Sequence, residues 1–217
     1  LHMRALRQEE LVYKIENWAD DVESTARMGR TQGIELGITG GGEDGVDNSD
    51  ANPEDLYSKP AEVAYAYERL MEVSPNFTIA AAFGNVHGVY KPGNVKLTPT
   101  ILRDAQTHIA EKHVTASDKP VNFVFHGGSG SSAAEIEEAL GYGVIKMNID
   151  TDTQYAFTRP VVNHMLKNYD GALRIDGEVG NKKLYDPRNW GAAAEAGMAS
   201  RVIQAAMQLG SAGKSAW

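Results

Sequence analysis

Residues 121–130 read Val-Asn-Phe-Val-Phe-His-Gly-Gly-Ser-Gly. The apolar part of this stretch ends in a histidine and two consecutive glycines, and a helical pattern with Ile136, Ala139 and Leu140 follows. Short apolar runs bounded by turn residues are typical of strands buried in a parallel sheet. The stretch therefore predicts a strand, a polar turn and a helix, the unit from which α/β folds are built.

Similar units recur on both sides of this stretch. Strands are predicted over residues 33–37, 77–84 and 144–149, and helices over residues 60–73, from Thr98-Pro99 through residue 109, and from Asp186-Pro187 to Gly210. Alternating strands and helices indicate a parallel sheet with helical crossovers. Loops that follow the carboxyl ends of such strands gather at one edge of the sheet, so we expect the chemistry there.

Composition narrows the class of protein. The 217 residues include 21 Lys and Arg against 29 Asp and Glu, a net charge of −8, and no cysteine. An acidic chain without clustered basic residues is not expected to bind nucleic acid. Its longest apolar run, near residues 79–83, is too short for a membrane span. Without thiols, a metal would need His, Asp or Glu ligands. No signal-peptide pattern opens the chain, and we expect a cytoplasmic protein.

The segment 126–132, His-Gly-Gly-Ser-Gly-Ser-Ser, carries the strongest local signal. Glycines before a helix let backbone amides turn toward an anion, so the segment predicts a phosphate cradle. A plain glycine-rich turn with a serine cap is the simpler alternative. Residues 128–133 also fit a loose dinucleotide fingerprint, with Asp150 twenty residues beyond Gly130. We disfavour that reading because a histidine before the glycines has no evident role in binding pyrophosphate.

A second strand also ends in a histidine followed by a glycine. Residues 83–94 read Phe-Gly-Asn-Val-His-Gly-Val-Tyr-Lys-Pro-Gly-Asn. A lone histidine is usually a packing residue, but neighbouring strand ends lie only about 5–10 Å apart. His87 and His126 are therefore predicted to share one metal ion, most plausibly zinc. The remaining histidines are assigned to the surface or to packing: His2, His108, His113 and His164.

Carboxylates and amides near the other predicted strand ends are further candidates. Glu35 lies between apolar neighbours on a short strand and is a candidate metal ligand, with a structural ion pair as the alternative. Residues 38–55 are predicted to form a long loop, in which glycines flank Glu43 as they would flank an acid/base on a lid. Asn148 and Asp150 alternate at the end of the last strand and are expected on one face.

Four motifs together carry a family resemblance. They are Glu35 with Glu43, residues 83–94, Phe-His-Gly-Gly-Ser-Gly at 125–130, and Lys-Met-Asn-Ile-Asp-Thr-Asp-Thr at 146–153. The chain closely resembles class II, metal-dependent fructose-1,6-bisphosphate aldolase, and the likeness continues through residues 182–188. Members of that family are (β/α)8 TIM barrels, usually dimeric or larger. They cleave fructose 1,6-bisphosphate to dihydroxyacetone phosphate and glyceraldehyde 3-phosphate in glycolysis and gluconeogenesis.

The resemblance implies a role for each matching residue. His87 and His126 would bind zinc, and Glu35 matches a carboxylate of a second or alternative metal position. Glu43 would move a proton on the carbon of the enediolate, and Asn148 would hydrogen-bond that intermediate. Arg188 would reach the second phosphate, commonly across a subunit interface. The residues expected to hold the dihydroxyacetone phosphate end are Gly88, Gly127, Gly128, Ser129, Asn148, Asp150 and Thr151.

The resemblance also implies a cofactor and partners. We expect Zn²⁺, with a second divalent or a monovalent cation left open, a sugar bisphosphate as substrate, and a homodimer or larger homo-oligomer. Two alternatives stay open: a tagatose-bisphosphate aldolase, and a non-catalytic half-barrel that binds phosphate or metal.

Departures from the family pattern affect the first part of the chain. The family's third zinc-binding histidine lies in a His-Thr-Asp-His type motif, which this sequence lacks, and Gly42 replaces an acidic residue before Glu43. Residues 1–32 are mostly helix-compatible and are left unassigned, whereas residues 33–217 are assigned to the C-terminal half of a TIM barrel, about its last four β/α units. The sequence is accordingly expected to represent part of an aldolase or a true half-barrel, and 217 residues alone are expected to be inactive or unstable.

Overall fold

The computed structural model describes residues 8–37, 40–43, 46–47, 56–87, 96–173, 175–176 and 179–214. Only the backbone is described for residues 8–10, 40–43, 46–47, 86–87, 175–176 and 179. The chain divides into two compact units, Leu1–Asn148 and Ile149–Trp217. No helix in the described ranges is long and apolar enough to cross a membrane.

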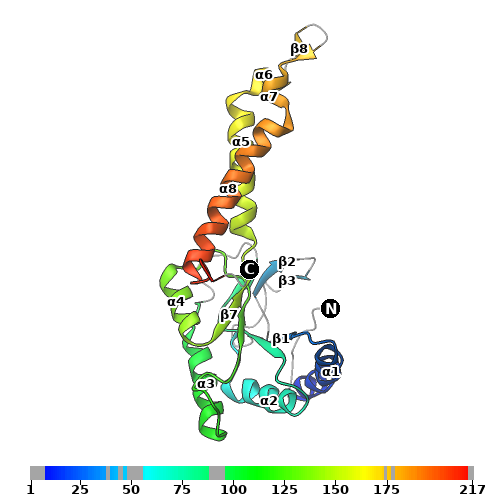
Figure 1. The fold of residues 1–217 in the computed structure, drawn as a ribbon, viewed down its shortest axis with the longest axis vertical. Helices are drawn as coiled ribbons and strands as arrows, with labels where there is room; N and C mark the ends of the chain where they lie inside the picture. Colours follow the sequence, from blue (N-terminus) through cyan, green and yellow to red (C-terminus); the bar gives the residue numbers. More distant parts are fainter. Residues whose placement is uncertain are drawn as a thin grey trace. The chain divides into compact units, whose positions relative to one another are not determined.

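The first unit is built on a four-stranded parallel sheet (Figure 1). Its strands are β1 (Gln32–Leu36), β4 (Phe77–Ala81), β6 (Phe123–Phe125) and β7 (Val144–Met147), and they lie in chain order. The predicted strands are thus confirmed, although β4, β6 and β7 are each shorter than the sequence pattern indicated. The predicted α/β class with a parallel sheet is also confirmed.

Three helices connect these strands in the order that the sequence predicted, and a fourth precedes the first strand. The connecting helices are α2 (Pro60–Met71), α3 (Thr100–Lys112) and α4 (Ala133–Gly141), and α1 (Gln8–Arg27) precedes β1. Each helix contacts the next one along the chain, so the four helices form one layer. Crossovers between neighbouring parallel strands are almost always right-handed, and a run of them in one direction places every helix on the same face of the sheet.

The core lies between the helical layer and the sheet and continues across the sheet itself. Phe83 and Phe125 are fully buried, and their rings meet edge to face with centroids 4.8 Å apart. All three residues of β6 are buried, as expected for a central strand of a parallel sheet. The helices contribute their buried faces to this core: Val63, Leu70, Leu102, Ile109 and Ala139.

The prediction of a loop over residues 38–55 is wrong for part of that range. Residues Gly40–Glu43 form β2 and Val46–Asp47 form β3, and β2 also pairs in parallel with β5 (Val86–His87). Strand pairing uses backbone amides and carbonyls, so a glycine run can pair without any apolar side chain to bury. Glycine and polar residues give no hydrophobic pattern, so the sequence pattern did not predict this second sheet.

The second unit is a helical hairpin with a small two-stranded sheet. Its helices are α5 (Thr151–Lys167), α6 (Tyr169–Leu173), α7 (Lys182–Tyr185) and α8 (Pro187–Gln208), and β8 (Ile175–Asp176) pairs with β9 (Val179–Gly180). The two long helices α5 and α8 pack along each other. Gly197 lies so close to α5 that an added Cβ would be 2.5 Å from the carbonyl oxygen of Ala156. A small residue at that position allows the close packing.

Candidate functional site

Three polar side chains meet at the carboxyl end of the four-stranded sheet. The Nε2 atom of His126 lies 3.3 Å from Oε1 of Glu35, and its Nδ1 atom lies 3.3 Å from the side-chain nitrogen of Asn148. Glu35 belongs to β1, whereas His126 and Asn148 directly follow β6 and β7. The structure therefore brings together three of the residues singled out from the sequence, from three different strands.

Backbone hydrogen bonds fix the ends of β6 and β7 side by side. The Asn148 amide donates to the Phe125 carbonyl at 2.8 Å, and the Gly128 amide donates to the Asn148 carbonyl at 3.1 Å. A Cβ at Gly128 would be 2.0 Å from the Met147 side chain and 3.2 Å from the Asn148 carbonyl oxygen, so a side chain there would displace Met147. These contacts explain why His126 and Asn148, twenty-two residues apart in the chain, face each other.

The hydrogen bond to Asn148 also indicates which imidazole nitrogen carries the proton. When the Asn148 amide donates to Nδ1, that nitrogen is the acceptor and the neutral ring carries its proton on Nε2. The Nε2 atom then faces the Glu35 carboxylate, whose Oε1 lies 3.3 Å away. His126 is largely buried, with 17% of its side chain exposed, whereas 39% of the Glu35 side chain is exposed.

The pair formed by Glu35 and His126 fits one metal ion. Two ligands of a tetrahedral zinc ion, each about 2.0–2.1 Å from the metal, lie about 3.3 Å apart. The separation of Glu35 Oε1 and His126 Nε2 is 3.3 Å. Imidazole and carboxylate are also ligand types that zinc accepts. Among the side chains that the structure describes, no group of three or more His, Asp or Glu residues converges into a metal site.

The side chains of His87 and Glu43 lie outside the described residues, as does the whole of Gly88. Backbone pairing nevertheless relates the two segments, because His87 of β5 is opposite Gly41 of β2, two residues before Glu43. The predicted sharing of a metal by His87 and His126 therefore stays a prediction.

The glycine-serine turn after β6 is strongly bent. Gly127 and Gly130 have φ angles of 63° and 84°, a region that suits glycine. At the start of α4, Ser132 accepts a hydrogen bond from the Glu135 amide, and the Glu135 carboxylate accepts one from the Ser132 amide. Because Glu135 already places a negative charge at this helix end, an anion would bind at residues 127–129 rather than at the first turn of α4.

Asp150 and Thr151 lie in the second unit, at the start of α5. Asp150 is the residue before the helix, and its carboxylate accepts a 2.8 Å hydrogen bond from the side chain of Gln154. The expectation that Asn148 and Asp150 alternate on one strand is wrong, because β7 ends at Met147. The amides of residues 153 and 154 donate to the Asp150 carbonyl, because helix α5 begins at Thr151. Asp150 and Thr151 therefore belong to the start of this helix and not to a strand.

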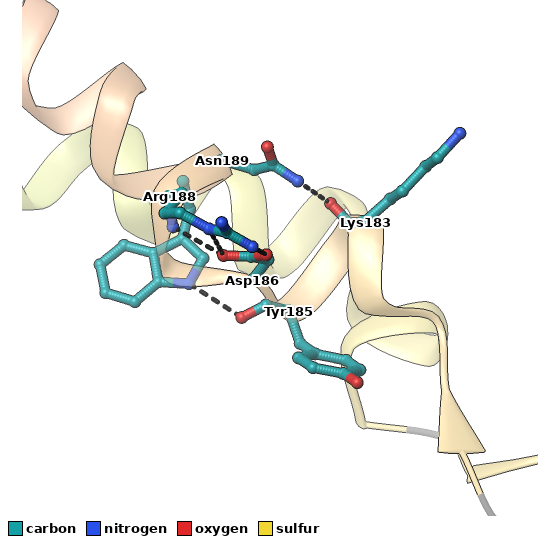
Figure 2. A network of polar contacts seen from close by, with 6 residues as sticks. Lys183, Tyr185, Asp186, Arg188 and Asn189 are labelled. Atoms are coloured by element: carbon teal, nitrogen blue, oxygen red, sulfur yellow. Dashed lines mark hydrogen bonds and ion pairs between the residues drawn. The ribbon is translucent and has the colours of Figure 1, made fainter.

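Arg188 is held by a carboxylate of its own helix start (Figure 2). Its Nε and Nη2 atoms donate to Asp186 at 3.0 and 2.6 Å, and its amide donates to the same carboxylate. These side-chain and backbone hydrogen bonds from Arg188 lower the pKa of Asp186 from 3.8 to about 2. Neighbouring bonds from Asn189 to the Lys183 carbonyl and from Trp190 to the Tyr185 carbonyl tie the same turn together.

A wide depression lies at the opposite end of the sheet from these candidates. It has a volume of about 760 Å³ and runs between α2 and residues 113–120, which precede β6. Two of its polar groups already pair with each other, since Glu68 lies 2.9 Å from His113, and Glu68 also pairs with Lys112 at 2.6 Å. We therefore place the candidate site at Glu35, His126 and Asn148 rather than in this depression.

Two supporting residues were not singled out in the sequence. Ser58 and Asn85 are buried, with 4% and 3% exposure, and both bond to backbone groups near the carboxyl ends of β1 and β4. Asn85 accepts a 2.9 Å hydrogen bond from the Phe83 amide and so shapes the turn before His87. An asparagine next to a glycine was a visible turn signal. Ser58 gave no signal, because its partners are distant in sequence.

Comparison with known proteins identifies the family. A model of the family described as class II fructose-bisphosphate aldolase matches residues 2–214. The chain belongs to this family. The match begins near the N-terminus and therefore includes residues 2–32, for which the sequence alone suggested no counterpart in the family.

Individual relatives agree with the family match. The fructose-bisphosphate aldolase of Borreliella burgdorferi is 51% identical over 96% of this chain, and that of Mycobacterium bovis is 58% identical over 84% of it. The crystal structure of the Campylobacter jejuni fructose-bisphosphate aldolase superposes on 93% of the chain with a TM-score of 0.77 and 46% identity. The chain spans 59%, 53% and 57% of the length of these three proteins, respectively.

Proposed function

We propose that this aldolase-family chain carries the metal- and substrate-binding edge of an enzyme that reversibly cleaves fructose 1,6-bisphosphate. The products are dihydroxyacetone phosphate and glyceraldehyde 3-phosphate, as in the reaction that glycolysis and gluconeogenesis share. The observation that carries the proposal is the meeting of Glu35, His126 and Asn148 at the carboxyl end of the sheet. Active sites of α/β barrels lie at that end of the strands.

We assign a zinc ion to His126, with His87 and Glu35 as further ligands. The 3.3 Å separation of Glu35 Oε1 and His126 Nε2 supports this assignment. Bound there, zinc would act as a Lewis acid that disperses the negative charge developing on the substrate oxygen. A second divalent or a monovalent cation near Glu35 is part of the same proposal.

The chain's own residues protonate and hold the intermediate. In the cleavage direction the C3–C4 bond breaks and its electron pair moves toward the C2 carbonyl to give the enediolate, while the C4 hydroxyl gives its proton to a base and becomes the aldehyde of glyceraldehyde 3-phosphate. The family resemblance assigns this base to an aspartate of the His-Thr-Asp-His type motif, which this sequence lacks. Glu43 then delivers a proton to C3 of the enediolate, which completes dihydroxyacetone phosphate. Asn148, held against His126 by the 3.3 Å contact, is positioned to hydrogen-bond the enediolate oxygen.

Two separate groups of residues bind the phosphates. Gly127, Gly128 and Ser129, together with Gly88, Asp150 and Thr151, are assigned to the dihydroxyacetone phosphate end, supported by the bent glycine backbone after β6. Arg188 is assigned to the second phosphate. Its guanidinium is bound to Asp186, so substrate binding there requires the phosphate either to share the guanidinium or to replace the carboxylate.

The fold and assembly belong to the same proposal. We infer that residues 33–217 supply about the last four β/α units of a (β/α)8 barrel in a cytoplasmic protein. The second unit supports a homodimer or larger assembly, because α5 and α8 expose large apolar side chains that a partner would cover. Members with at least 49% exposure include Leu166, Val202, Ile203 and Met207.

Zinc and ligand binding test the site directly. Equilibrium dialysis followed by metal analysis should find one tightly bound zinc ion in the wild-type chain, and His126→Ala should weaken zinc binding at least about 100-fold. Glu35→Gln should weaken it less, because Glu35 is the more exposed ligand. His108→Ala, at an exposed position of α3, is the matched control and should bind zinc normally.

Activity and substrate binding complete the test. In the whole protein, His126→Ala should abolish bisphosphate cleavage in a coupled assay, and the zinc-loaded chain should bind dihydroxyacetone phosphate. Equal zinc content in the wild-type and His126→Ala proteins would refute the site. Cleavage of tagatose bisphosphate in preference to fructose bisphosphate would keep the mechanism and correct the substrate.

A further inference from the structure

We propose that residues 56–58 position the two candidate metal-binding segments relative to each other, with Ser58 and Tyr57 as the positioning residues. The inference rests on the proposed function, because it concerns Glu35 of β1 and the segment that carries His87. The structure places residues 56–58 across the carboxyl ends of β1 and β4, bonded to both. Tyr57 and Ser58 are not among the residues proposed to bind the metal or the substrate.

Ser58 joins the end of β1 to the chain that leaves β4. Its hydroxyl donates to the Leu36 carbonyl at 2.9 Å and accepts a hydrogen bond from the Ala82 amide at 2.9 Å. Its own amide donates to the Ala82 carbonyl at 2.7 Å. Leu36 directly follows Glu35, so this buried hydroxyl fixes the backbone that carries the candidate ligand.

Leu56 and Tyr57 hold the segment that carries His87 at both of its ends. Before His87, the Gly84 amide donates to the Leu56 carbonyl at 3.1 Å. After His87, the Tyr57 hydroxyl donates to the Lys96 carbonyl at 2.9 Å and accepts a hydrogen bond from the Lys96 amide at 3.2 Å. Gly84 and Lys96 are themselves in close contact, since a Cβ at Gly84 would lie 2.2 Å from the Lys96 carbonyl oxygen.

One short segment thus connects the strand of Glu35 with both ends of residues 84–96. Metal ligands must be held within a few tenths of an ångström, and the groups that orient them change metal affinity although they never touch the metal. Removing this buried hydroxyl takes one of two partners from each of these backbone groups, because the Ala82 amide also donates to the Leu36 carbonyl at 3.1 Å. Ser58 is therefore expected to matter for the arrangement of the site and not only for stability.

Amide hydrogen exchange tests the positioning without any metal. In Ser58→Ala, the amides of residues 35–37 and 82–85 should exchange about tenfold faster, because their local hydrogen bonds open more easily. Ser58→Thr keeps the hydroxyl and should restore slow exchange. Tyr57→Phe should accelerate exchange at residues 84–85 and 96–98, whereas Tyr142→Phe, which removes an exposed tyrosine hydroxyl, is the matched control.

Zinc affinity tests the consequence for the site. Ser58→Ala should weaken zinc binding about tenfold, the lower end of the range for residues that orient metal ligands, and Ser58→Thr should recover it. Gln106→Leu removes a buried side-chain bridge at the other end of the sheet and should leave zinc affinity within about threefold of wild type. This control separates a general loss of stability from a loss of positioning.

The possible outcomes distinguish the inference from the proposed function. Faster exchange together with unchanged zinc affinity in Ser58→Ala would overturn the positioning role, and so would unchanged exchange. If the wild-type chain binds no zinc, the proposed metal site fails, and the exchange data alone then show whether residues 56–58 hold the two segments together.

Discussion

The two ends of the four-stranded sheet use buried polar side chains in different ways. At the amino end, Gln106 donates to the carbonyls of Val121 and Tyr142 at 2.8 and 3.0 Å and accepts from the Val121 amide at 3.0 Å. All of its bonds go to the backbone. At the carboxyl end, the side chains of His126 and Asn148 contact each other at 3.3 Å, and His126 also contacts Glu35.

The buried polar side chain at the amino end stabilises the fold, whereas those at the carboxyl end are candidates for the chemistry. A side chain that bonds to the backbone stabilises the fold, but it is not available to a ligand because its removal leaves buried groups unpaired. Side chains that bond mainly to one another can exchange a neighbour for a metal ion or a substrate oxygen. At the carboxyl end, Ser58 and the glycines stabilise the backbone, whereas Glu35, His126 and Asn148 are the residues proposed for the chemistry.

The largest effect on stability is expected at Gly84 and tests whether the carboxyl end of the sheet requires glycine at this position. Gly84 has a φ of 85°, and an added Cβ would lie 2.2 Å from the Lys96 carbonyl oxygen. Gly84→Ala combines backbone strain with a clash and should cost about 4 kcal/mol of unfolding free energy. Gly130 has nearly the same φ, 84°, but nothing within 4 Å of its Cβ position. Gly130→Ala should therefore cost only about 1 kcal/mol.

Urea denaturation of the two alanine variants measures this difference. Equal costs would show that φ alone matters and that the contact between Gly84 and Lys96 does not constrain the carboxyl end.

A slightly smaller loss of stability is expected when Gln106, at the amino end of the sheet, is replaced. Gln106→Leu keeps the size of the side chain but leaves the Val121 amide and the Val121 and Tyr142 carbonyls without this partner, so it should cost about 3 kcal/mol. His108→Leu, at an exposed position of the same helix, should change stability by less than about 0.5 kcal/mol. Denaturation in urea distinguishes the two, and similar midpoints for both variants would contradict the structural role of Gln106.

Much of the fold could be predicted from local sequence. Apolar runs predicted the four sheet strands. Ser131 or Ser132 was predicted to cap α4 and Asp186 to precede α8, and the structure has Ser132 and Asp186 as the capping residues. The short strands of residues 40–47 were missed because their glycines pair through the backbone, which no hydrophobic pattern reports. Strand ends were also placed too late: β7 ends at Met147, although the Asn148 amide still donates to the Phe125 carbonyl.

The candidate site was predictable where the signal was chemical and local. A histidine before two glycines pointed to His126, and its contact with Glu35 in the structure agrees with the prediction that both lie at one sheet edge. The contribution of Ser58 was not predictable, because its partners Leu36 and Ala82 are 22 and 24 residues away. Arg188 and Asp186 are only two residues apart, yet a phosphate was the only partner predicted for Arg188.

The smallest effect concerns an ion pair at the amino end. Hydrogen bonds from Lys112 and His113 lower the pKa of Glu68 below 4.5. Because the folded-state pKa lies below the unfolded value, Glu68 adds stability above about pH 4.5 and loses it as the pH falls through its lowered pKa. Lys112 is half exposed, so the contribution should stay below about 1 kcal/mol. Glu68→Gln should therefore be slightly less stable than wild type at pH 7, and the difference should shrink in acid. A difference that grows below pH 4.5 in urea titrations would contradict the ion pair.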